Sequence, residues 1–168
     1  SIFVDEQNGL TIVDLKSKCR MLAKQHGLDM IIIDYLQLMT GMKGASNRQE
    51  EISQISRGLK ELAKELKVPI LALAQLSRDV EKRGIGAKPQ LSDLRESGAI
   101  EQDADMIWFV NRPNYYDKEF DPNYAELIIA KHRNGPTDTI KMTWIGSHTG
   151  FYNYAPPQDQ YYPDQEVF

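Results

Sequence analysis

Unbroken runs of apolar residues mark the strands around which this chain is organised. Residues 30–33 read Met-Ile-Ile-Ile and stop at Asp34, and residues 69–74 read Pro-Ile-Leu-Ala-Leu-Ala and lead to Gln75. Runs without alternation are typical of strands that are buried on both faces of a parallel sheet. The sequence therefore predicts two central strands that end in a carboxylate and an amide.

Helical periodicity separates these strands. Residues 50–66 place apolar side chains at helical spacing on one face, so they predict a long amphipathic helix with a solvated charged face. Upstream, Thr11 is a predicted N-cap with Asp14 three residues later, and Gly27 ends that helix. Residues 1–5 are expected to form a short strand. Strands that alternate with long helices favour right-handed crossovers and a mostly parallel sheet.

The last third of the chain predicts two further apolar strands and a hairpin. The strands are expected at residues 105–111 and 125–130, and a return strand at residues 138–145. The intervening turn contains Asn134 and Gly135, and Asn-Gly is a strong short-range hairpin signal. We therefore expect an α/β fold in which helices flank a mostly parallel β-sheet that ends in an antiparallel hairpin.

Composition narrows the class of protein. The 168 residues are 41% apolar and 26% charged, which suits one soluble globular domain. We expect this domain to cover residues 1–151 and an irregular tail to cover residues 152–168. No apolar run reaches the length of a membrane span, no signal peptide is visible, and the single Cys19 fits a reducing, cytoplasmic setting.

The net charge of −4 gives no general attraction to nucleic acid. Contact with DNA would therefore require a local basic patch, or charge that several subunits contribute together.

Each strand predicted to be parallel ends in a polar residue, in order Asp34, Gln75, Asn111 and Lys131. Ligands bind at the carboxyl edge of open α/β sheets, so we expect these residues to gather there. A carboxylate can hold Mg²⁺ or its bound water beside phosphates, and an amide can sense a phosphate or orient a water. The alternative for Asp34 is a residue that merely ends its strand.

Lys131 and Arg133 alternate at the predicted turn, so their side chains are expected to project on the same side. Charges on an exposed turn contribute little to stability. A guanidinium there could instead reach a phosphate in a neighbouring site, where it can contact two oxygens at once.

Four motifs in this chain resemble, in order, those of the DnaB-type bacterial replicative helicases, which are RecA-like hexameric ATPases. The motifs occupy residues 34–39, 75–78, 93–105 and 130–136. Four ordered motifs are far more specific than one glycine-rich signature. The resemblance extends over about residues 1–152 and implies the C-terminal portion of a RecA-like helicase motor domain.

The resemblance also implies roles for single residues. Asp34 would be the Walker B carboxylate at Mg²⁺, acting through water, and Gln75 would couple the γ-phosphate of ATP to the DNA loops. Lys131 and Arg133 would reach the ATP of the adjacent subunit, with Arg133 as the arginine finger. Single-stranded DNA would be contacted in the central channel by two loops, one with Arg95, Glu96 and Gly98 and one, within residues 40–49, with Lys43 and Arg48.

The implied assembly is a homohexamer in which six acidic subunits still form a basic channel. Binding to single-stranded DNA should be sequence-tolerant and salt-sensitive, because contacts to phosphates carry little sequence information. Primase and a helicase loader are further partners implied by the family. From the residues alone, Arg95 and Glu96 would equally suit a local ion pair on a solvated turn.

The chain departs from the family in one respect: it contains no Gly-x-x-x-x-Gly-Lys-Ser/Thr motif. In the family this P-loop and the glutamate that activates water lie upstream of the segment present here. We therefore expect that these 168 residues alone neither bind ATP·Mg²⁺ tightly nor hydrolyse it, and that they form a marginal or self-associating fragment.

Three alternatives are kept open. A receiver-type signalling domain would use Asp34 as phosphoacceptor, after a first strand that ends in Asp5 and Glu6. Another RecA-like ATPase, such as a recombinase or a circadian-clock-type ATPase, would share the fold. A non-catalytic binding module would carry a decayed ATPase fold.

Overall fold

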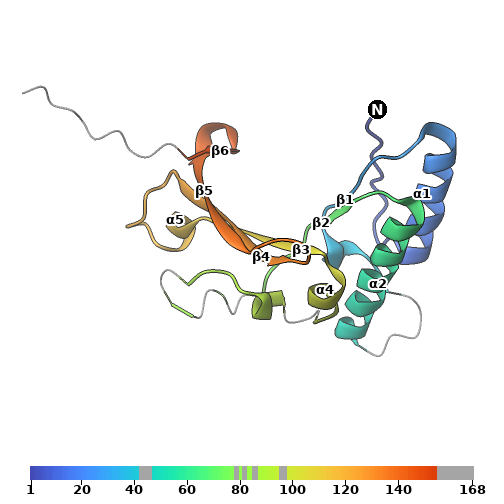
Figure 1. Ribbon diagram of the computed structural model, residues 1–168, viewed down its shortest axis with the longest axis horizontal. Helices are drawn as coiled ribbons and strands as arrows, with labels where there is room; N and C mark the ends of the chain where they lie inside the picture. Colours follow the sequence, from blue (N-terminus) through green and yellow to red (C-terminus); the bar gives the residue numbers. More distant parts are fainter. Residues whose placement is uncertain (42–46, 78–79, 81–82, 85–86, 95–97, 155–168) are drawn as a thin grey trace, which may run out of the picture. The chain divides into compact units, whose positions relative to one another are not determined.

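A computed structural model describes residues 1–41, 47–77, 80, 83–84, 87–94 and 98–154 of the chain. It divides into two compact units (Figure 1). The first comprises residues 1–82 and 90–105, and the second comprises residues 83–89 and 106–168.

The first unit contains a pair of parallel strands and two long helices. Strand β1 (Ile31–Ile33) pairs with β2 (Ile70–Ala72), with Ile31 opposite Ile70. Helix α1 (Ile12–His26) precedes β1, and helix α2 (Arg48–Leu66) connects β1 to β2. The predicted alternation of strand and helix is thus present here. None of the helices in the described ranges is long and apolar enough to cross a membrane.

The described part of this unit also contains the short helices η1 (Leu36–Leu38), η2 (Leu91–Leu94) and α4 (Gly98–Asp103). Of these, α4 packs against α2, where Asp103 accepts a hydrogen bond of 2.8 Å from the Ser56 hydroxyl.

The hydrophobic core of the first unit forms between the two helices and one face of the β1–β2 pair. Ile55 and Leu62 of α2 are completely buried. In β1, Ile31 is 7% exposed, whereas Ile32 is 63% exposed. The prediction that β1 is buried on both faces is therefore wrong for the described residues, because they cover only one face of the strand.

A close approach of α1 and α2 depends on Gly58. A β-carbon at this position would overlap Cγ1 of Ile12, which is itself 3% exposed. The two helices are adjacent in Figure 1. Because Gly58 has no side chain, Ile12 of α1 can pack directly against α2.

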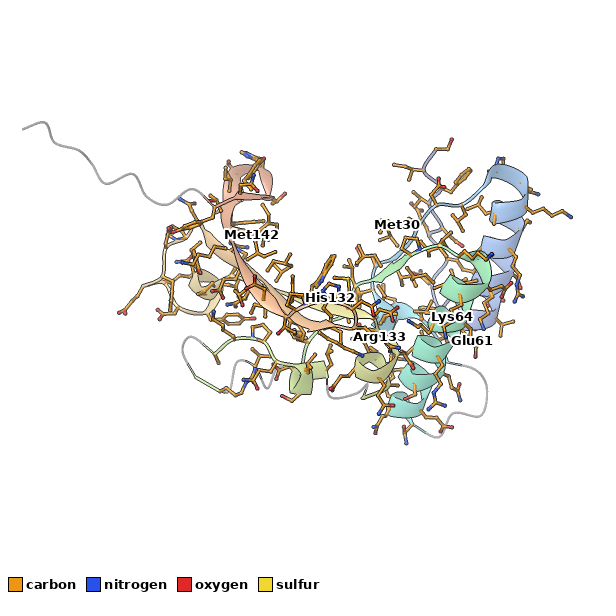
Figure 2. The ribbon with its side chains drawn as sticks, viewed as in Figure 1. Met30, Glu61, Lys64, His132, Arg133 and Met142 are labelled. Atoms are coloured by element: carbon orange, nitrogen blue, oxygen red, sulfur yellow. The ribbon has the colours of Figure 1, made fainter. Side chains whose placement is uncertain are left out.

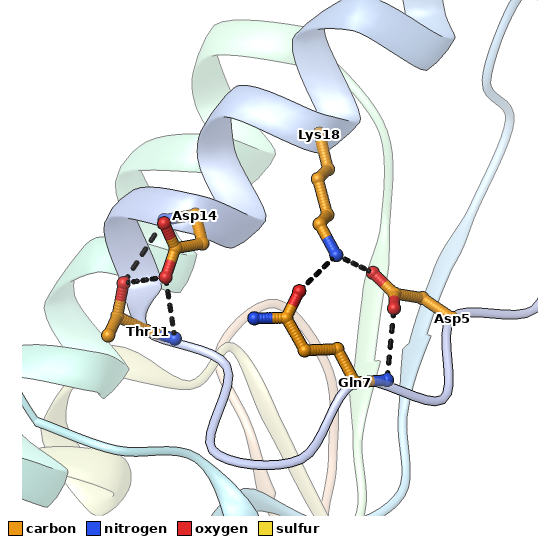
Figure 3. Close-up of polar contacts among 5 residues, drawn as sticks. All are labelled: Asp5, Gln7, Thr11, Asp14 and Lys18. Carbon is orange, nitrogen blue, oxygen red and sulfur yellow. Dashed lines mark hydrogen bonds and ion pairs between the residues drawn. The ribbon is translucent and has the colours of Figure 1, made fainter.

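Helix α1 begins as the sequence predicts, at a capping box (Figure 3). The Thr11 hydroxyl accepts the Asp14 N–H at 3.2 Å and donates to the Asp14 carboxylate at 2.6 Å. Lys18, one turn further on, binds Asp5 and Gln7, each at 2.6 Å. The hydrogen bond from Lys18 and that from the Gln7 backbone lower the pKa of Asp5.

Residues 1–5 form no strand, contrary to the prediction, because no described strand pairs with them. They are held by side chains instead: Asp5 binds Lys18, and the Phe3 ring lies 5.1 Å from that of His26.

The second unit is a four-stranded antiparallel sheet in the order β3-β4-β5-β6. Its strands are β3 (Met106–Asn111), β4 (Tyr124–His132), β5 (Asp138–Ile145) and β6 (Gly150–Asn153). Two short helices, α5 (Pro113–Tyr116) and η3 (Gly146–His148), lie between strands. The β4–β5 hairpin and the bounds of β5 match the prediction.

Two expectations for this region are wrong. Strand β3 pairs with β4 in antiparallel orientation, so neither extends a parallel sheet. The reason is the connection at residues 112–123, which carries only the short α5 and returns the chain directly instead of supplying a crossover helix. Tyr152 and Asn153, assigned to the irregular tail, belong to β6.

The contact of Gly58 with Ile12 predicts a cost for Gly58→Ala. Overpacking at a helix–helix contact should outweigh the helix propensity gained, so we expect a loss of about 1–3 kcal/mol in the free energy of unfolding. Denaturant titration of the full-length protein measures it. Gly98→Ala is the matched control, because a β-carbon there meets no atom within 4 Å. Equal stability of both variants would contradict the packing argument.

Candidate functional site

Asp34 and Gln75 lie at the same edge of the parallel strand pair. Each follows the carboxyl end of its strand, and the strands run in register. The ladder continues past their assigned ends: the Leu73 N–H donates to the Ile33 carbonyl and the Leu36 N–H to the Leu73 carbonyl, each at 2.9 Å. The backbone thus brings a carboxylate and an amide to one edge, where ligands bind in this class of sheet.

Both side chains are available to a ligand. Asp34 and Gln75 are exposed, and within the described ranges neither side chain has a hydrogen-bond or ion-pair partner. The same ranges contain no group of three or more His, Cys, Asp or Glu residues that could hold a metal ion. A single carboxylate nevertheless suits Mg²⁺, which proteins commonly bind through one or two carboxylates together with water and substrate phosphates.

The backbone of Gln75 is held by the side chain of Gln37. Its Nε2 donates to the Gln75 carbonyl at 3.1 Å, and its Oε1 accepts the Gln75 N–H at 3.2 Å. Gln37 belongs to η1, directly after Asp34 and Tyr35. Sequence reasoning missed this residue, because a side chain that pairs with a backbone leaves no periodic signal.

Arg48 is the first residue of α2, and its predicted position in a loop is wrong. Asn47 caps the helix by accepting the Glu50 N–H at 2.9 Å. Asparagine is a preferred N-cap residue, and the sequence places it three residues before Glu50. The Arg48 guanidinium donates to the Gln37 carbonyl at 2.8 Å, to Glu51 at 2.7 Å and to the Met39 carbonyl at 3.4 Å. These contacts favour a structural role, and a DNA contact by Arg48 stays a prediction.

In the second unit, Lys131 and Arg133 lie where β4 runs into the β4–β5 turn. Figure 2 labels Arg133 there. Arg133 is exposed and Lys131 is partly buried. The last β4–β5 pair joins Ile129 to Asp138, so both cationic residues lie beyond the ladder between these strands. A β-carbon on Gly135 would overlap the His132 ring, so this ring would have to move to admit one.

Asn111 and Lys131 do not share an edge, contrary to expectation. Because β3 and β4 are antiparallel, Asn111 lies opposite Glu126 and Lys131 opposite Ile107. Asn111 is 5% exposed and donates to the Glu126 carboxylate at 3.0 Å. Its amide is therefore used in a buried hydrogen bond between β3 and β4.

Glu126 is the centre of a buried polar cluster. Besides Asn111, Lys88 binds its carboxylate at 2.7 Å and the Tyr124 hydroxyl donates to it at 2.8 Å. Burial alone would raise the pKa of Glu126, but the three hydrogen bonds and the charge of Lys88 lower it overall. Burial, the hydrogen bond to Glu126 and the nearby charge raise the pKa of Tyr124 to about 12. Lys88 thereby fastens residues 87–89 to the sheet.

Comparison with known proteins decides the family. The model of the DnaB-like helicase C terminal domain matches residues 1–153 of the chain. The chain belongs to this family. The receiver-type and recombinase-type alternatives are thereby set aside.

Relatives of this DnaB-like chain are replicative helicases. Over 157 residues it is 50% identical to the replicative DNA helicase DnaB of Leifsonia xyli, a match that covers 92% of this chain and 34% of that protein. It is 49% identical to the replicative DNA helicase DnaC of Bacillus subtilis, over 90% of this chain and 34% of that protein. The chain thus spans about a third of the length of these relatives.

Solved structures support the same fold. A DnaB-like replicative helicase, described with its interactions with primase, superposes with a TM-score of 0.82 at 45% identity, over 90% of this chain and 37% of that one. A second solved structure, described as an ATPase domain, gives a TM-score of 0.80 at 46% identity, over 88% and 52% of the two chains. The RecA-like expectation is confirmed at the level of the fold, although the sheet is less parallel than predicted.

Of the residues expected at DNA, Lys43, Arg95 and Glu96 lie outside the described ranges. Gly98 is exposed at the start of α4. The Ser77 N–H donates to the Asp93 carbonyl at 3.0 Å, so the segment after Gln75 is joined to η2. The first residue of the DnaB-type motif at residues 93–105 therefore has a backbone link to the segment that carries Gln75.

The buried cluster predicts a pH-dependent contribution to stability. The pKa of Glu126 in the folded protein lies below its ordinary value of 4.5, so its contribution is complete above pH 4.5 and is lost as pH falls through the lower, folded pKa. Glu126→Gln should therefore cost about 2–3 kcal/mol near neutral pH, and the difference from wild type should shrink in acid.

Denaturant titrations of the full-length protein at several pH values measure this difference. Glu119→Gln, at an exposed carboxylate of the same unit, is the matched control and should leave stability unchanged. A pH-independent cost of Glu126→Gln would show that the negative charge is not what stabilises the cluster.

Proposed function

We propose that this chain is the C-terminal portion of the motor domain of a hexameric, ATP-dependent replicative DNA helicase, which moves on single-stranded DNA and unwinds duplex DNA. Membership of the DnaB-like family supports the class of activity. The observation that carries the proposal is the exposed pair Asp34 and Gln75 at one carboxyl edge of a parallel strand pair.

In this proposal Asp34 holds Mg²⁺ through water at the edge of the sheet. Bound there with ATP, the metal ion would supply positive charge beside the phosphates that react. Gln75 contacts the γ-phosphate and, through the chain that follows it, transmits the nucleotide state to the DNA loops. The 168 residues contain no P-loop motif, so the phosphate cradle is proposed to come from another part of the full-length protein.

Lys131 and Arg133 complete the pocket of an adjacent subunit. Both lie past the ladder of the β4–β5 hairpin, and Arg133 is exposed. A guanidinium supplied across a subunit interface stabilises charge that develops on the transferred phosphoryl group. We propose a homohexamer on this basis.

Single-stranded DNA is proposed to pass through the hexamer along Arg95, Glu96, Gly98 and Lys43. Six copies of a few cationic side chains would make a basic channel in a protein whose subunits carry a net charge of −4. Primase and a helicase loader are proposed partners of the full-length protein.

Substitution of the two edge residues tests the activity. In the full-length protein, Asp34→Asn should lower kcat for ATP hydrolysis by ~10²-fold or more, because the carboxylate that holds the metal is lost. Gln75→Ala should remove most of the stimulation by single-stranded DNA. Steady-state hydrolysis with and without DNA measures both. Wild-type rates in both variants would overturn the proposal.

Subunit mixing tests whether Arg133 acts between subunits. Arg133→Ala alone should lower kcat by ~10³-fold, as expected for an arginine finger. If Arg133 serves the neighbouring pocket, mixing this variant with Asp34→Asn subunits restores wild-type pockets at about a quarter of randomly formed interfaces in a ring. Activity should then reappear in the mixture. If Arg133 serves its own subunit, every pocket keeps one defect and mixing restores nothing.

A further inference from the structure

The parallel ladder between β1 and β2 stops short of Gln75. Its last backbone bond joins the Leu36 N–H to the Leu73 carbonyl. Beyond this point, the Gln37 side chain supplies both bonds that a neighbouring strand would make, one to the Gln75 carbonyl and one from the Gln75 N–H. An amide side chain can do this because it offers one donor side and one acceptor side in a single plane.

Gln37 is itself fixed by its surroundings. Its neighbour Leu36 is 3% exposed and Met39 is 5% exposed, so η1 is anchored in the core. The Gln37 carbonyl accepts a hydrogen bond from Arg48 of α2, which also binds Glu51 of α2. Thus α2 holds Gln37, and Gln37 holds the backbone of Gln75.

We propose that Gln37 is a positioning residue for ATP hydrolysis, which acts only through Gln75 by extending the strand ladder past β1. The inference rests on the proposed function, in which Gln75 senses the γ-phosphate. Gln37 leaves the Gln75 side chain free while it fixes the peptide on both sides of the Cα atom. Loss of these bonds lets the peptide rotate, so the amide meets the phosphate in the right geometry less often.

This role predicts a particular kinetic signature. Gln37 makes none of the proposed contacts to ATP, so its loss should leave KM for ATP within about twofold of wild type while kcat falls by ~10-fold. Stimulation by single-stranded DNA should fall with kcat, because both depend on Gln75. A purely structural role would lower the melting temperature without this split.

The test uses three variants of the full-length hexamer: Gln37→Met, Gln75→Ala and the double variant. Methionine preserves the volume of Gln37 and removes both hydrogen bonds. If Gln37 acts only through Gln75, the double variant should have the same kcat as Gln75→Ala alone. Gln25→Ala, at an exposed position on α1, is the control and should behave as wild type.

A second substitution at the same position, Gln37→Glu, distinguishes the hydrogen bond to the Gln75 carbonyl from the one that accepts the Gln75 N–H. It keeps the acceptor for the Gln75 N–H but places a carboxylate oxygen against the Gln75 carbonyl. We expect it to be at least as impaired as Gln37→Met. If Gln37→Met does not assemble, Gln37→Glu compared with Gln75→Ala and with their double variant gives the same comparison.

The outcomes distinguish the two proposals. The positioning role would be overturned by a wild-type kcat in Gln37→Met or in Gln37→Glu. It would also be overturned by a double variant in which the losses of the two single variants multiply. If Gln75→Ala is impaired in either case, the proposed function remains intact. Wild-type kinetics in Gln75→Ala would instead remove the sensor role on which the inference rests.

Discussion

The register of two parallel strands is the constraint on which the candidate site depends. Because Ile31 lies opposite Ile70, Asp34 and Gln75 must emerge at the same edge. Among the described residues, this register is held from one face, by a core centred on the fully buried Ile55 and Leu62 of α2. The alignment of a carboxylate with an amide is therefore maintained by apolar packing some residues away, and in the described ranges the Asp34 and Gln75 side chains have no hydrogen-bond or ion-pair partner. They remain free to bind a ligand.

Polar contacts then refine what packing establishes. The strand register brings Gln75 to this edge, but the backbone hydrogen bonds between the two strands end at Leu73, before it. Beyond Leu73, the Gln37 amide binds the Gln75 backbone, and the Arg48 guanidinium binds the Gln37 carbonyl. In the second unit, Glu126 plays a comparable part, because Lys88 binds its carboxylate and so ties residues 87–89 to the antiparallel sheet. In both cases a side-chain contact secures a segment of the chain.

Much of this could be predicted from the sequence, and the failures have physical causes. The capping box at Thr11, the long helix α2 and strand β5 follow from local periodicity and capping chemistry. The orientation of β3 does not follow from its sequence. Met106–Asn111 is apolar at five of six positions, whereas buried and exposed residues alternate strictly along the strand. An apolar run therefore cannot distinguish a parallel central strand from an antiparallel one. The roles of Gln37 and Arg48 depend on contacts to backbone carbonyls, which no spacing encodes.

The two proposed halves of the catalytic pocket lie in different compact units, and this has a consequence for the proposed motor. Asp34 belongs to the first unit and Arg133 to the second, so in the proposal each unit contributes one charged group to a different pocket. An exposed cation on a hairpin contributes little to the stability of its own subunit. In the proposed ring, Arg133 would act on a phosphate in the pocket of another subunit. Formation of the ring would then complete the active site, and hydrolysis would depend on assembly as strictly as on nucleotide.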